Sequence, residues 1–361
     1  MKKESVSDDR SALGLIAIIG VLNLLFALIA LFVRYGPITE NGASALFWRF
    51  RFDPAITLPI LLFAFFYILG ARRRRSTEEH AEGWRHLAFF GGFSAIYLAL
   101  QSPLDWISDR LFFAHQIEHM LLDMVAPILL VLAAPQAALL RGLPRPFRRR
   151  VVGPSLGSAI FRFLRFFTHP AVATALFIGA MDFWMIPHMQ DAALENERLH
   201  DLMHATLLAS GLIFFWRVLD KRPYPLGASL GTRLFMFSLA SISNILVGSF
   251  LAFKNTILYP AYGPSPHLFG IAAIDDERFG GLIMWIMGSE MLALAAILTI
   301  RHFARDEERR EVRRQAVRER TADWFLERRA ANRRLALGLV SFSGVILLIT
   351  VGTVLVYHYV E

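Results

Sequence analysis

The chain has 361 residues, of which 55% are hydrophobic, with a mean hydropathy of +0.45 and a formal net charge of +8. This composition is too apolar for an ordinary soluble domain and is typical of a polytopic membrane protein, in which clustered Lys and Arg mark topology rather than nucleic-acid binding. The sequence contains no cysteine, which excludes disulfides and thiolate metal ligands.

Nine segments are long and apolar enough to cross a bilayer, which predicts an all-α, multi-pass transmembrane bundle. Most Lys and Arg fall before the first segment and after the second, fourth, sixth and eighth. The positive-inside rule therefore predicts a cytoplasmic N-terminus and an outer C-terminus. The first segment is too long for a signal-peptide core, and we expect it to be retained. The segments cover residues 12–33, 53–71, 85–102, 113–134, 169–188, 200–218, 231–253, 279–300 and 335–357.

From these segments we predict that the whole chain, 1–361, is a single integral membrane domain. Residues 301–334 form a mixed-charge segment with few apolar residues, which we expect to be a solvated cytoplasmic helix touching anionic headgroups.

The fourth segment carries His115, His119 and Asp123 at intervals of four residues, so a regular helix would present them on one face. Ionisable side chains in a bilayer point into the bundle, towards partners or water. Asp123 is placed either to ligate an ion or to orient an imidazole. Met120 lies on the adjoining face, where packing is more typical than ligation.

The sixth segment repeats the pattern with His200 and His204, and Met203 lies beside them. Both pairs are expected at the outer end of their helices, so four imidazoles could share one ion. Imidazole suits copper, zinc and iron, and thioethers favour Cu(I). The alternative is that these histidines are interfacial or only make hydrogen bonds.

Asp182 in the fifth segment and Glu290 in the eighth are further intramembrane carboxylates, each a candidate proton acceptor or ion ligand. The sequence has no phosphate-binding glycine loop, nucleophile elbow or HExxH motif, so we expect no enzymatic activity.

Residues 85–300 resemble the multi-span CtaG family of bacterial cytochrome c oxidase assembly factors. The resemblance lies in HQIEHMLLDMVAPILLVLAAP at 115–135, HDLMHATLLASGLIFFW at 200–216, LYPAY at 258–262 and DERFGGLIMW at 276–285. It implies that the family's histidines correspond to His115, His119, His200 and His204, and its outer-loop residues to Tyr259, Tyr262 and Asp276. The chain departs from the family in Glu118, where glutamine is common, and in Glu277 and Arg278, where two glutamines are frequent.

The resemblance implies a non-enzymatic factor in a bacterial cytoplasmic membrane that supports maturation of a haem-copper oxidase at its copper centres. We expect copper, as Cu(I), near the outer face, and oxidase subunits and a copper-donor protein as partners beside the lipid bilayer. Two alternatives stay open: a copper transporter with Asp182 and Glu290 as deeper stations, and a membrane protein that binds haem through two histidines.

The topology gives a first prediction. Single cysteines introduced into this cysteine-free chain should be labelled from the cytoplasm at Arg73, Arg149 and Arg310, and from outside at Asp191 and Pro264, because basic loops stay inside. Labelling of residues 301–334 from outside would contradict the predicted orientation.

Overall fold

A computed structural model describes residues 52–73, 83–152, 165–220, 222, 227–263 and 268–318, with single residues between 154 and 163 and between 333 and 340. All secondary structure in these ranges is helical, with no β-strand, which confirms the predicted all-α class. The chain divides into two units, Met1–Ala296 and Ile297–Glu361.

Five helical stretches of the described chain are long and apolar enough to cross a membrane, and a sixth is possible if one bent pair counts as a span. The bent pair is α12 (Pro170–Trp184) and α13 (Pro187–Glu195), which meet at 73°. The five are α3 (Pro54–Arg72), the run of α6 (Phe112–Met120), η2 (Leu121–Val125) and α7 (Ala126–Ala133), α14 (Glu197–Val218), α15 (Leu230–Phe253) and the apolar part of α16 (Ala273–Arg318).

The predicted count of nine spans is thus supported only in part. The segment at 85–102 is helical, as α4 (Gly83–Gln101), but it is not among the five. Trp84, Arg85 and His86 at its start and Gln101 at its end lower its mean hydropathy. The predicted span at 12–33, nearly all of that at 335–357, both termini and residues 319–332 lie outside the described residues, so the orientation stays a prediction.

Proline explains the bend in the span predicted at 169–188. Ile186 has extended backbone angles, φ −64° and ψ 124°, because the ring of Pro187 disfavours helical geometry in the residue before it. Pro187 then begins α13, where its missing N–H is not needed. The predicted straight span is therefore a helix followed by a short second helix at a steep angle.

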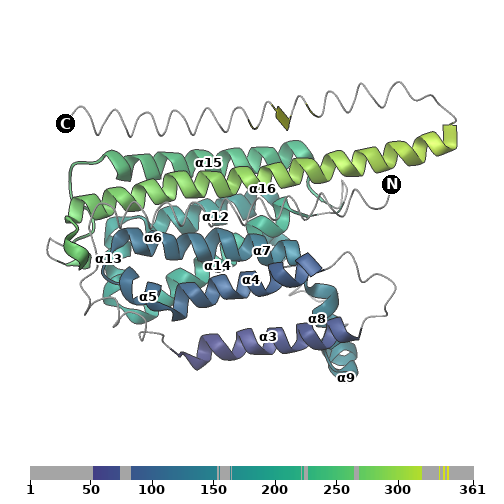
Figure 1. Cartoon of the computed structure of the whole chain (residues 1–361), viewed down its shortest axis with the longest axis horizontal. Helices are drawn as coiled ribbons and strands as arrows, with labels where there is room; N and C mark the ends of the chain where they lie inside the picture. Colours follow the sequence, from purple (N-terminus) through teal and green to yellow (C-terminus); the bar gives the residue numbers. More distant parts are fainter. Residues whose placement is uncertain are drawn as a thin grey trace. The chain divides into compact units, whose positions relative to one another are not determined.

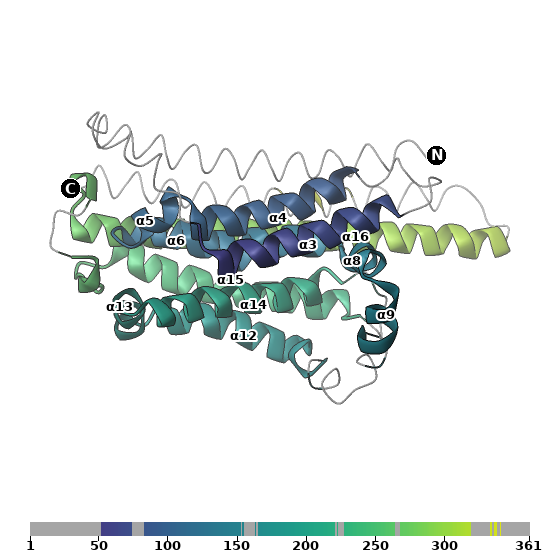
Figure 2. The ribbon, with the colours of Figure 1, turned by 90° about the horizontal axis from the view of Figure 1, so that it is seen from below.

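Within the first unit, α4 packs on α7, and α12 packs on both α14 and α15 (Figures 1 and 2). The α14 helix also contacts η2 and α7, so it adjoins the predicted histidine-bearing span. Two groups of short elements lie near opposite ends of these helices. One contains α5 (Pro103–Ser108), α13, η4 (Pro260–Tyr262) and η5 (Leu268–Gly270); the other contains α8 (Gln136–Gly142), α9 (Arg145–Phe147) and η3 (Arg148–Val152).

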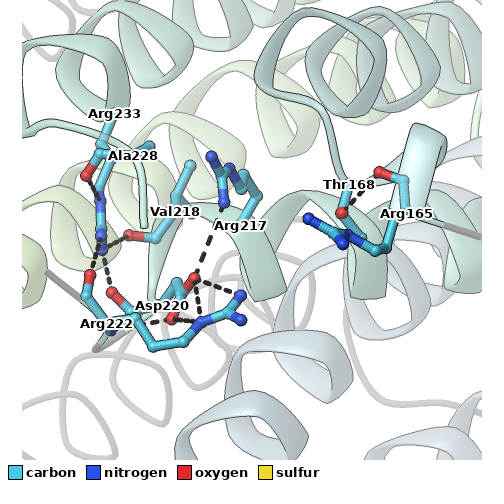
Figure 3. Close-up of polar contacts among 8 residues, drawn as sticks. All are labelled: Arg165, Thr168, Arg217, Val218, Asp220, Arg222, Ala228 and Arg233. Carbon is cyan, nitrogen blue, oxygen red and sulfur yellow. Dashed lines mark hydrogen bonds and ion pairs between the residues drawn. The ribbon is translucent and has the colours of Figure 1, made fainter. Parts of the chain in front are cut away.

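At the end opposite α13, the buried guanidinium of Arg233 closes the C-terminus of α14 (Figure 3). It donates hydrogen bonds to the carbonyl oxygens of Val218 at 3.0 Å and of Ala228 at 3.0 Å, and also to that of Asp220. A cation there compensates the negative end of the helix and satisfies carbonyls that have no partner within it.

The second unit begins at Ile297, within α16, and therefore includes the C-terminal part of this helix. His302 and Asp306 form an i,i+4 pair on it with 3.3 Å between Nε2 and Oδ2. Glu307 to Arg310 on the same helix are exposed.

Arg233 gives a prediction for stability. Arg233→Met should lower the free energy of unfolding by on the order of 2 kcal/mol or more, because several buried carbonyls lose a charged donor. The melting temperature in detergent should fall accordingly. Arg149→Gln is the matched control, since Arg149 is exposed on η3. Equal melting temperatures for both variants would show that the α14 terminus does not depend on Arg233.

Candidate metal centre

The structure brings together the four histidines that the sequence singled out. The ring centroids of His115 and His119 on α6 lie 4.4 Å apart, and those of His200 and His204 on α14 lie 4.3 Å apart. Across the two helices, His115 lies 5.1 Å from His200 and 5.8 Å from His204, and His119 lies 5.8 Å from His204. His115, His119 and His204 are buried, whereas His200 is half-buried.

Glu118 joins this cluster, although the sequence analysis treated it only as a departure from a family pattern. One ligand atom each from His115, Glu118, His200 and His204 can be chosen so that all four atoms lie within 4.8 Å of one another. The carboxylate of Glu118 is fully buried, and its Oε1 lies 3.6 Å from Nε2 of His204. Three imidazoles and one carboxylate form a donor set that copper and zinc both accept.

Several donor atoms of this cluster are buried without a hydrogen-bond partner among the described residues. They include Nε2 of His115, both ring nitrogens of His119 and Nε2 of His204. A buried nitrogen without a partner costs roughly 1–3 kcal/mol. A metal ion that accepts their lone pairs would offset that cost, so the cluster fits a metal by its chemistry as well as by its spacing.

A second layer of polar groups orients His115. Its Nδ1 lies 2.8 Å from the hydroxyl oxygen of Tyr262, and that oxygen accepts a hydrogen bond of 2.8 Å from Nε2 of Gln190. Burial raises the pKa of the Tyr262 hydroxyl well above its usual value, so the group keeps its proton. When Nδ1 of His115 donates to Tyr262, Nε2 is left with a free lone pair facing the cluster.

Asp276 fixes the start of the helix that carries His115. Its buried carboxylate accepts the backbone N–H of Phe112 at 2.8 Å and that of Phe113 at 3.0 Å. These are amides of the first turn of α6, which have no partner inside the helix. Gly280 permits the close approach of α16, since a Cβ there would lie 2.3 Å from the ring of Phe112.

Glu277, the next residue, fixes the loop that carries the two tyrosines. Its buried carboxylate accepts the backbone N–H groups of Leu258 and Tyr259 at 2.9 Å each and pairs with Lys254. The hydroxyl of Tyr259 donates to the carbonyl of Met185 at 2.8 Å, at the bend between α12 and α13. The neighbouring carboxylates of α16 therefore hold α6 and the tyrosine loop in one arrangement.

Asp123 is fully buried, and it lies in an irregular turn below His119 rather than in the regular α-helix that the spacing assumed. Residues Leu121–Val125 form a turn of π-helix, in which the backbone bond runs from Ala126 N–H to Leu121 C=O. This turn changes the helical register below His119. Gly211 of α14 packs against it, since a Cβ there would lie 2.1 Å from the carbonyl oxygen of Asp123.

The remaining predicted residues lie outside the donor cluster. Met120 and Met203 are buried in the main hydrophobic core. Asp182 is half-buried and accepts a 2.7 Å hydrogen bond from Ser243. Glu290 is half-buried on α16.

The sequence analysis did not predict that two buried residues of this region, Glu118 and Gln190, take part in the site. Glu118 could have been found from its spacing, because it follows His115 by three residues and so shares its face of α6. Gln190 carries no such signal, since it reaches His115 across 75 residues of sequence.

A sequence model of the family described as cytochrome c oxidase caa3 assembly factor matches residues 65–306, about two thirds of the chain. An uncharacterized protein of Mycobacterium leprae is 25% identical over 274 residues, which are 74% of this chain and 41% of the relative. An uncharacterized protein of Mycobacterium bovis is 25% identical over 267 residues, 72% of this chain and 40% of the relative.

The chain thus spans about two fifths of the length of these mycobacterial relatives. No solved structure matches it.

The cap on α6 gives a prediction for the cluster. Asp276→Ala should destabilise the protein by about 1–2 kcal/mol, because two amides of the first turn lose their acceptor. Thermal unfolding in detergent measures this loss. Asp275→Ala is the matched control, since the side chain of Asp275 is 33% exposed and its Oδ1 lies 3.9 Å from Nη1 of Arg278. Equal melting temperatures for the two variants would contradict the assigned role.

Proposed function

Because this chain belongs to the cytochrome c oxidase caa3 assembly factor family, we propose that it holds copper at the His115, Glu118, His200 and His204 cluster and supports its insertion into a haem-copper oxidase. The observation that carries the proposal is the convergence of buried imidazoles from two helices with a buried carboxylate. The protein is proposed to act without catalysis, in a bacterial cytoplasmic membrane, with oxidase subunits and a copper donor as partners.

The position of the cluster supports an exchangeable metal. His200 is only half-buried, and the cluster lies at the end of the helices where α5, α13 and the tyrosine loop gather. Under the predicted topology this is the outer end. A copper ion could therefore reach the cluster from the outer side and leave for an oxidase subunit there without crossing the bilayer.

We propose Cu(I) as the state to test first. Imidazole binds copper, zinc and iron alike, so the nitrogen donors do not select one metal. Met120 and Met203 are buried on the same two helices as the histidines, and thioether ligands favour Cu(I). His119 has two ring nitrogens without hydrogen-bond partners in the described chain and supplies a further imidazole beside the cluster.

The two alternatives receive less support. A transporter would use Asp182 as a deeper station, but this carboxylate is already bonded to Ser243. Net copper uptake into sealed vesicles would nevertheless decide in favour of transport. Haem needs two axial imidazoles on opposite faces of a flat ring, whereas the rings of His115 and His119 meet edge to face at 4.4 Å. A Soret band in the purified protein would decide for haem.

The purified full-length protein should bind about one Cu(I), and His204→Ala should weaken binding at least tenfold, because removal of a ligand leaves the ion under-coordinated. Competition with a Cu(I) chelator measures the affinity. His188→Ala is the matched control, since His188 is exposed on α13. Wild-type affinity in His204→Ala, and in a variant with all four histidines replaced, would refute the metal site.

Oxidase activity in the host shows whether the histidine cluster supplies copper or only supports the fold of this protein. Cells with His204→Ala should lose activity when copper is scarce and regain part of it when copper is added, because mass action refills a weakened site. Full activity at limiting copper, with the variant present at normal level, would contradict a role of this cluster in copper supply.

A further inference from the structure

A short helical hairpin places three acidic residues beside the histidine cluster. The chain leaves α5 at Ser108, turns through Asp109 to Leu111 and enters α6 at Phe112, so that α5 packs along α6 (Figures 1 and 2). On the apolar side of α5, Leu104 and Ile107 pack against a group of buried hydrophobic residues that includes Leu111 and Ile117. Its polar side carries Asp105, and Asp109 ends it.

These carboxylates form a series of increasing burial that leads to Glu118. Asp109 is exposed, Asp105 is 7% exposed, and Glu118 is fully buried. Both aspartates lie within electrostatic reach of the Glu118 carboxylate, and Ser108 is buried next to it. Glu118 in turn lies 3.6 Å from His204, so the series ends on a donor of the cluster.

The nearest basic side chain of the hairpin is turned away from this series. Arg110 stacks on the ring of Trp106, with its guanidinium carbon 4.1 Å from the ring centroid, and donates to the carbonyl of Trp106 at 2.7 Å. No ion pair of Asp109 is present in the described part of the chain. The charge of Asp109 therefore stays available at the surface, where it attracts cations.

We propose that α5 provides the access route for the metal cation, with Asp109 capturing it at the surface and Glu118 delivering it to the histidines. The inference rests on the proposed metal site and adds to it a direction of approach and a charge selectivity. Glu118 acts twice on this route, because its carboxylate first contacts the incoming ion and then remains one of its ligands.

The physical effect of such a route is on the rate of association. Surface carboxylates raise the local concentration of cations and speed capture, and added salt screens the effect. Once the ion is bound among the buried donors, Asp109 no longer contacts it. Removal of the Asp109 charge should thus slow capture and leave release unchanged, whereas loss of a ligand changes release.

Stopped-flow mixing of the full-length protein in detergent with Cu(I), supplied as its acetonitrile complex, tests this route through quenching of tryptophan fluorescence. Asp109→Asn should lower the association rate roughly threefold to tenfold at low ionic strength. The difference should vanish at high ionic strength, and dissociation into excess chelator should keep its rate. Glu118→Gln should slow association and also speed dissociation.

Glu195→Gln is the matched control, since Glu195 is an exposed carboxylate at the end of α13 and contributes no donor to the cluster. An association rate for Asp109→Asn equal to that of the wild type, or an equal fall in Glu195→Gln, would overturn the route while leaving the metal site intact. Absence of histidine-dependent Cu(I) binding in the wild type would instead refute the proposed function itself.

Discussion

The buried contact between Asp276 and the first turn of α6 is the constraint on which the polar interior depends. Two backbone amides of a helix that begins inside the protein need acceptors, and the carboxylate supplies both at 2.8 and 3.0 Å. Because His115, Glu118 and His119 lie within the two turns that follow, their positions are set by where this helix begins. The adjacent Glu277 applies the same chemistry to the loop that carries Tyr262.

The same buried environment explains why the cluster suits a cation. Four imidazoles of α6 and α14 meet here, and a neutral imidazole offers one ring nitrogen with a lone pair to a metal ion. Tyr262 keeps its proton, and its hydroxyl can accept from Nδ1 of His115, which directs the other nitrogen into the cluster. Glu118 adds the single negative charge among these donors, and it lies next to the hairpin that carries Asp105 and Asp109.

The two ends of the helices have opposite chemistry. At one end, carboxylates accept backbone N–H groups: Asp276 caps the N-terminus of α6, and Glu277 binds the loop that carries the tyrosines. At the other, arginine guanidinium groups close C-termini: Arg233 caps α14, and Arg73 donates to the carbonyl of Arg141 at 2.9 Å. Both assignments follow the helix dipole. Some of the arginines that mark topology in the sequence therefore also satisfy buried or partly buried carbonyls, as Arg233 does.

The sequence by itself determined the all-helical class, most described helices and the two histidine pairs, because hydropathy and four-residue spacing depend only on neighbours along the chain. It also indicated the family through short motifs around those histidines. Pro187 and the three-residue spacing of Glu118 from His115 are local signals that the sequence already carries, whereas only the tertiary structure decided where Asp276 and Gln190 lie relative to α6. Asp276 reaches Phe112 across 164 residues, and Gln190 reaches His115 across 75. Contacts over such separations depend on which helices pack together, and local spacing does not encode that choice.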